Sequence, residues 1–156
     1  MDTSSTQFSQ LISALNQRAG LALQASEGAC AFLDREGAYW QLSLGLGSDA
    51  LVIQAALGPL AALAADDTPL QLLHLNADPA LLRGAALGVD PVTAEIRLLH
   101  TVPLDGLDAA RLESMLTNLM AVRDAVLARL DAAAAAAAET LDRAPHAVPP
   151  GLMNFA

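Results

Sequence analysis

The sequence has one cysteine, no lysine and few aromatic residues. A single cysteine cannot form an internal disulfide, which is typical of proteins from a reducing cytoplasm. The eight basic residues, all arginines, are scattered among 17 acidic residues, so nucleic acid is not an expected partner. No run of about 18 uncharged apolar residues occurs outside alanine-rich stretches, which predicts no membrane span. Met1–Gln10 also lacks the basic and apolar regions of a secretory signal.

What the sequence does contain is a high proportion of apolar residues. Hydrophobic residues make up 54% of the 156 positions and charged residues only 16%. This length predicts one domain with a sizeable core. The net charge of −9 keeps an apolar surface soluble through mutual repulsion between molecules. Together these features predict that part of the apolar surface is covered by a second subunit or by another protein.

The first predicted element is an amphipathic helix over residues 5–19. Its apolar residues recur at helical spacing, at Phe8, Leu11, Ile12 and Leu15. Ser4 and Gln7 have the spacing of a capping box at its start, and Thr6 is an alternative cap. Gly20 permits a left-handed stop after its end.

Three strands are predicted next, over residues 29–34, 38–46 and 51–57. Their connections are short, which favours antiparallel hairpins and hence a meander. The first connection, "DREG", has two carboxylates beside an arginine, so it is a candidate for acid–base chemistry. No nucleophile, base or metal ligand lies near it in sequence, and Asp34 with Gly37 is typical of a solvated turn. The sequence therefore favours a hairpin turn over a catalytic corner.

The stretch "DDTPLQLLHLN" predicts a second helix that begins near Thr68 and Pro69. Its leucines occupy more than one side of the helix, so more than one side needs to be covered. In a chain of this size a second subunit is the expected cover. We therefore predict a homodimer whose interface includes Leu72, Leu73 and Leu75.

The remaining elements complete an α+β fold. The Asp78–Pro79 step ends or restarts the second helix. Two strands over 84–89 and 95–102 form another hairpin, and a long helix runs from Asp108 to about Arg143 through a seven-alanine run. The composition of 144–156 predicts a flexible Pro-rich tail, which leaves 1–143 as the domain. The predicted order is helix, three-strand antiparallel meander, helix, two strands and long C-terminal helix.

No group of residues has the spacing of a known active site or metal site. His74, His100 and His146 have no second histidine, cysteine or carboxylate at a ligand spacing. Cys30 lies between alanines, without a basic neighbour that would activate its thiol. The acidic pair at 66–67 fits the positive end of the helix that follows it. The sequence therefore predicts no enzyme activity, no metal and no cofactor.

Several phrases, in this order, resemble the Tir-chaperone-like class I type III secretion chaperones, small dimers that escort effector proteins in Gram-negative bacteria. "FSQLISALNQRAGLAL" is similar to the opening helix of that family, "GACAFLDREGAYWQLSL" to its Cys-x-Phe-x-Asp hairpin, and "LVIQAALGPL" to its third strand. "LLHLN" resembles its helix that reads Leu-Leu-x-x-Asn, and "AALGVDPVTAEIRLLHTVPLDGLD" its late hairpin and the entry to its last helix. The resemblance spans about residues 6–130, and the alanine run and the tail depart from it.

The resemblance implies a cytoplasmic homodimer that binds the N-terminal region of a secreted effector in an extended, non-globular form and keeps it soluble and secretion-competent. Such a client segment would add strands at sheet edges and place apolar side chains in grooves. For client binding we single out Leu11, Leu15, Leu33, Val52 and Leu99, of which Leu11 and Leu15 also fit an ordinary core. The alternative is a dimeric α+β scaffold of a larger assembly, without an unfolded client.

Overall fold

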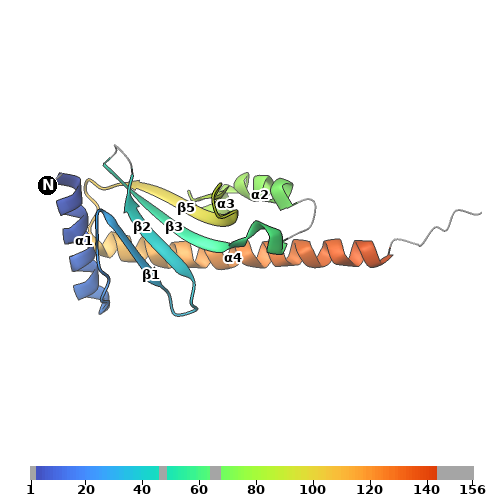
Figure 1. Ribbon diagram of the computed structural model, residues 1–156, viewed down its shortest axis with the longest axis horizontal. Helices are drawn as coiled ribbons and strands as arrows, with labels where there is room; N and C mark the ends of the chain where they lie inside the picture. Colours follow the sequence, from blue (N-terminus) through green and yellow to red (C-terminus); the bar gives the residue numbers. More distant parts are fainter. Residues whose placement is uncertain (1–2, 46–48, 64–67, 144–156) are drawn as a thin grey trace, which may run out of the picture.

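The computed structural model of the chain describes residues 3–45, 49–63 and 68–143. Its elements are, in chain order, α1 (Thr3–Ala19), β1 (Ala29–Leu33), β2 (Tyr39–Leu44), β3 (Ala50–Pro59), η1 (Leu60–Leu63), α2 (Thr68–Asn76), α3 (Pro79–Leu82), β4 (Ala86–Val89), β5 (Glu95–Pro103) and α4 (Ala109–Arg143). Figure 1 shows a twisted sheet with α4 running along it. The predicted α+β order of elements is confirmed, whereas the predicted tail, 144–156, lies outside the described residues.

The five strands form one antiparallel sheet in the order β1-β2-β3-β5-β4. The predicted meander β1-β2-β3 is present, and β5 joins β3 on its other side, so β3 lies in the middle. The ladder slips once, between Ala56 and Gly58, where β3 has one residue more than β5. The two edges of the sheet are therefore β1 and β4.

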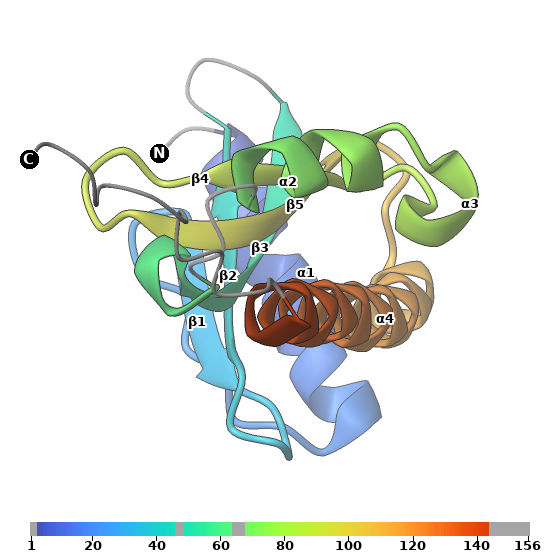
Figure 2. The same cartoon turned by 90° about the vertical axis from the view of Figure 1, so that its right-hand side faces the viewer.

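One face of the sheet carries the core. Alternate residues along β2 and β3 are buried, as the sequence pattern predicts: Trp40, Leu42, Leu51, Ile53, Ala55 and Leu57. They pack with the apolar faces of α1 and α4 in one cluster. Figure 2 views α4 nearly end-on and shows this helix on one side of the sheet. The residues between the buried ones lie on the opposite face, which is called the outer face below.

The long helix α4 begins at its predicted cap. One carboxylate oxygen of Asp108 accepts the backbone N–H of Arg111 at 2.7 Å. The buried stripe of α4 runs from Leu112 to Leu130. The helix continues to Arg143, 35 residues in all, which is about 52 Å at about 1.5 Å per residue. Its C-terminal part therefore extends beyond the sheet, as Figure 1 shows.

The first helix is present, but it begins two residues before the predicted start. α1 begins at Thr3 rather than residue 5, so Ser4 lies inside the helix. The Ser4 hydroxyl donates to the carboxylate of Asp49, and the side-chain amide of Gln7 donates to the carbonyl of Leu104. The predicted capping box is therefore absent, because both side chains instead tie α1 to distant parts of the chain.

The Asp78–Pro79 step restarts the helix, one of the two outcomes predicted for it. One carboxylate oxygen of Asp78 accepts the N–H groups of Ala80 and Leu81, at 3.1 and 3.0 Å, and so caps α3. The short helix then ends at Arg83, in the left-handed conformation. Consequently β4 begins at residue 86, two residues later than predicted.

Candidate binding surfaces

Alternate residues of the edge strand β1 direct their backbone N–H and C=O groups out of the sheet. In an antiparallel pair, every second residue directs its N–H and C=O toward the partner strand, and the residues between direct theirs away from it. The N–H of Leu44 donates to the carbonyl of Gly28, and the N–H of Asp34 donates to that of Ala38. Even-numbered residues of β1 therefore face β2, and the odd-numbered residues point their backbone groups out of the sheet.

Two of these outward residues form an open edge. The outward backbone groups of Ala29 are already paired, because they form hydrogen bonds of 2.8 and 2.9 Å with the backbone of Ser26. Ala31 and Leu33 follow, and both are exposed, the Leu33 residue to 66%. Within the described ranges no group pairs with their outward N–H and C=O. Such unpaired edge groups are where an added strand can bind. Ala31 and Leu33 are called the β1 edge below.

An aromatic pair lies beside the β1 edge on the core face. The half-buried ring of Phe32 stacks on the fully buried ring of Trp40, with centroids 6.5 Å apart and planes inclined by 12°. A strand added to β1 would place a side chain about 4.5–5.5 Å from Phe32 on this face. The edge therefore offers apolar contact as well as hydrogen bonds.

Asp34 fixes the turn that ends β1. One of its carboxylate oxygens accepts the N–H groups of Glu36 and Ala38, each at 2.9 Å, and the other accepts the indole N–H of Trp40 at 2.9 Å. Partial burial acts to raise the pKa of this carboxyl. The three hydrogen bonds and the charge of Arg123 outweigh burial, so the pKa lies below its ordinary value. The "DREG" corner is thus a hairpin turn organised by Asp34.

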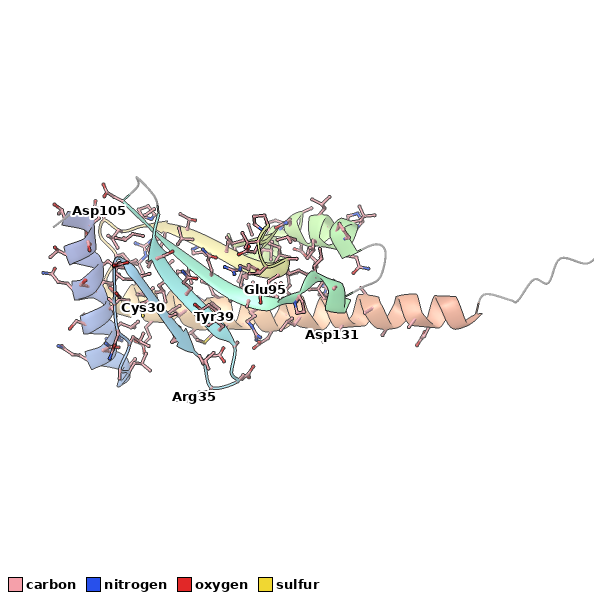
Figure 3. All side chains as sticks on the ribbon, in the orientation of Figure 1. Cys30, Arg35, Tyr39, Glu95, Asp105 and Asp131 are labelled. Atoms are coloured by element: carbon pink, nitrogen blue, oxygen red, sulfur yellow. The ribbon has the colours of Figure 1, made fainter. Side chains whose placement is uncertain are left out.

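The thiol of Cys30 and the guanidinium of Arg35 lie in different places around β1. Cys30 is buried in the core, and burial raises the pKa of its thiol, which keeps it protonated. Arg35 is exposed at the tip of the β1–β2 hairpin and points away from the sheet (Figure 3). The structure does not bring them together as a site.

Three residues predicted to bind a client share the outer face of the sheet. Val52 on β3 and Leu99 on β5 are half-buried and lie on adjacent strands, since Leu99 pairs with Gln54. Leu33 is on the same face but two strands away, at the β1 edge. The same face carries the guanidinium of Arg97, two residues before Leu99 on β5, which contacts Gln54 at 3.2 Å and Asp90 at 2.9 Å. The outer face is therefore interrupted by charged groups.

The other two residues predicted to bind a client lie inside the subunit. Leu11 and Leu15, on α1, are buried in the core, with exposed fractions of 6% and 1%. In this structure they are not accessible to a second chain, and their client-binding role stays a prediction. The function proposed below uses exposed groups instead.

The helix α2 presents leucines on two sides. Leu72 is buried within its own subunit and Leu75 is half-buried, whereas Leu73 is 66% exposed. Leu70, one turn before Leu73, is 52% exposed and was not among the predicted interface residues. Its i, i+3 spacing from Leu73 is the sequence signal that identifies it. Leu70 and Leu73 are called the α2 patch below.

The described residues contain no group of three or more histidine, cysteine or acidic side chains that could hold a metal ion. No helix among them is long and apolar enough to cross a membrane.

Comparisons with known proteins point to one family and one fold. The model of the Tir chaperone protein (CesT) family matches residues 10–127. A search of curated protein sequences found no significant match.

Several solved structures resemble the chain along most of its length. A chain of the HopA1–SchA chaperone–effector complex has a TM-score of 0.67 at 18% identity, and the match covers 80% of this chain and 95% of that one. A chain of the ExsC–ExsE complex has a TM-score of 0.66 at 22% identity, covering 79% and 92%. A chain of the ExoT–SpcS complex from Pseudomonas aeruginosa has a TM-score of 0.54 at 22% identity, covering 80% and 97%. At these identities the likeness establishes a shared fold.

Proposed function

This chain belongs to the Tir chaperone protein (CesT) family, and we propose that two copies of it bind the N-terminal region of a type III secreted effector in an extended, non-globular form. The dimer would act in the cytoplasm and keep that region soluble and competent for secretion. Family membership confirms the resemblance noted in the sequence and supports protein binding rather than catalysis. One chain of the HopA1–SchA chaperone–effector complex has the same fold as this chain, which supports an effector as the partner.

The β1 edge is the observation that carries the proposal of extended binding. Ala31 and Leu33 each offer one outward N–H and one outward C=O, so a client strand can form four backbone hydrogen bonds there. At about 0.5–1.5 kcal/mol net for each bond, the edge would contribute about 2–6 kcal/mol. Backbone pairing tolerates many client sequences, and Phe32 adds a preference for an apolar side chain on the core face.

The α2 patch supports the dimeric part of the proposal. Leu70 and Leu73 are exposed in a single subunit, and a two-fold dimer would bury the same patch on both copies. Each dimer would then carry two β1 edges. A client segment long enough to reach both edges would bind more tightly than either edge alone allows, because the second contact is intramolecular.

Substitution of Ala31 by proline tests the binding edge. The proline ring removes an N–H that faces outward and leaves the bonds between β1 and β2 in place, so the sheet should hold. The bound effector is first identified by mass spectrometry of chaperone purified from its native cytoplasm. A synthetic peptide covering its protected segment is then titrated by calorimetry.

Ala31→Pro should weaken peptide binding by at least roughly 2- to 12-fold, the equivalent of one lost hydrogen bond. Ala31→Ser keeps the N–H and should bind like wild type. Equal affinity for the proline and serine variants would place the client elsewhere. A partner that stays globular when bound would favour the scaffold alternative.

A further inference from the structure

The second edge of the sheet, β4, is built differently from the β1 edge. The N–H of Asp90 donates to the carbonyl of Glu95 at 2.8 Å, so even-numbered residues face β5 in this hairpin. The outward backbone groups of β4 therefore belong to Leu87 and Val89. By register alone, β4 would offer as many outward groups as Ala31 and Leu33 offer on β1.

Asn76, the last residue of α2, occupies the first of these positions. Its Nδ2 donates to the carbonyl of Leu87 at 3.0 Å, and its Oδ1 accepts the N–H of Leu87 at 2.8 Å. A primary amide side chain presents a donor and an acceptor side by side, as a backbone residue does in a strand. Asn76 thus forms the two bonds that an added strand would form with Leu87.

Little of the β4 edge remains open. The N–H of Ala85, just before β4, donates to the carbonyl of Leu82 at 2.9 Å, so the start of the strand is also closed. Val89 is the one outward residue left, at the end beside the turn. A strand that reached β4 would find half the backbone partners that it finds on β1.

We infer that Asn76 closes the β4 edge against the open β1 edge of other copies of this chain. A β4 edge and a β1 edge are different surfaces, so pairing them joins molecules head to tail. Contacts of this kind continue from molecule to molecule instead of closing into a dimer. A chain that keeps one edge open for a client needs its other edge closed, because two open edges promote edge-to-edge aggregation.

The closure depends on Asn76 because α2 has few other attachments to the sheet. The helix has nine residues, too few for stability without tertiary contacts. Over the described part of α2, Leu72 is the one buried hydrophobic side chain, and Leu75 is half-buried. Without the amide of Asn76, the end of α2 is free to move off the strand, which exposes Leu87 to an incoming edge.

Asn16 provides a matched control. Its Nδ2 donates to the carbonyl of Leu23 at 2.7 Å, and its Oδ1 accepts the N–H of Leu23 at 2.9 Å. This is the same pair of bonds, made by the same residue type, in the connection after α1. Asn16→Ala therefore removes an equivalent contact without opening β4.

The experiment compares Asn76→Ala, Asn76→Asp and Asn16→Ala by sedimentation velocity over a range of concentrations. Asp keeps the acceptor for the Leu87 N–H but replaces the donor by a second carboxylate oxygen, which repels the Leu87 carbonyl. Fluorescence of Trp40, the single tryptophan, shows which variants are folded. Both Asn76 variants should form species above the wild-type mass, with at least about a twofold rise in average mass as concentration increases. Asn16→Ala should sediment as wild type does.

A double variant then identifies the pairing. Ala31→Pro blocks the β1 edge, so adding it to Asn76→Ala should return the mass to that of wild type. At concentrations too low for association, exchange of the Leu87 amide hydrogen should be faster in Asn76→Ala than in wild type and unchanged in Asn16→Ala. Folded Asn76 variants with wild-type mass, or oligomers that persist in the double variant, would overturn the inference. Neither result bears on client binding, which Ala31→Pro tests alone.

Discussion

Leu73→Asp should dissociate the proposed dimer without unfolding the subunit. Leu73 lies on α2 and is 66% exposed in the single chain, so its side chain is available for contact with a second copy. Complete burial of a leucine side chain is worth about 1.5–3 kcal/mol, and roughly two thirds of that, about 1–2 kcal/mol, remains to be gained at the interface. A two-fold dimer contains the residue twice, which gives about 2–4 kcal/mol.

That free energy corresponds to a roughly 30- to 800-fold weaker dimer. A carboxylate at this position adds to the loss, because an unpaired charge is costly to bury. Sedimentation equilibrium over a concentration series measures the dissociation constant directly. The circular dichroism spectrum should keep the wild-type helix and strand content, since the substitution replaces an exposed side chain.

The neighbouring residue is the control for this reasoning. Leu72 is 7% exposed and packs within its own subunit. Leu72→Ala should therefore lower the free energy of unfolding, by about 2–5 kcal/mol, as is typical for a buried leucine. A Leu73→Asp variant with a wild-type dissociation constant would show that the α2 patch is not the interface. Equal loss of subunit stability in the two variants, measured at concentrations where wild type and variants are all monomeric, would refute the assignment of opposite sides.

Two further predictions concern turns. Asp34→Asn should lower the free energy of unfolding at pH 7 by about 1.5–3 kcal/mol, because a charged acceptor for Trp40 and two backbone groups is lost. The pKa of Asp34 is lowered in the folded state, so its contribution to stability is present above the unfolded pKa and is lost as the pH falls through the folded pKa. Urea titrations at several pH values should therefore show the free energies of unfolding of wild type and Asp34→Asn converging in acid. Ala94 has a φ of +54°, so Ala94→Gly should stabilise the chain by about 0.5–1 kcal/mol in urea unfolding, and a destabilised variant would contradict this.

The regular elements follow from local patterns in the sequence. Alternation along residues 38–46 and 51–57 predicts the buried face of β2 and β3, because a strand has a period of two. The role of Asp34 as a turn residue is also local, since its backbone partners lie within four positions of it. Local signals fail where a polar side chain has a distant partner. Ser4 and Gln7 have the spacing of a cap, yet their partners lie 45 and 97 positions away.

The candidate surfaces are predicted less completely than the fold. A leucine-rich helix indicates that α2 is covered on two sides, but the sequence does not say which leucine faces its own subunit. That assignment depends on where the sheet lies, and it separates Leu72 from Leu73. The β1 edge is not visible in the sequence either. Backbone groups leave no side-chain signal, so the openness of Ala31 and Leu33 follows only from strand order and register.

The short helix α2 links the proposed properties of this protein. Leu72 packs in the core, Asn76 bonds the end of the helix to Leu87, and Leu73 is exposed. A dimer that buries the α2 patch would hold the helix in this position, and any state that is favoured in the dimer is stabilised by association. Dimerisation and closure of the β4 edge should therefore reinforce each other. The β1 edge lies at the other end of the sheet, so a dimer formed through the α2 patch would leave it open for a client.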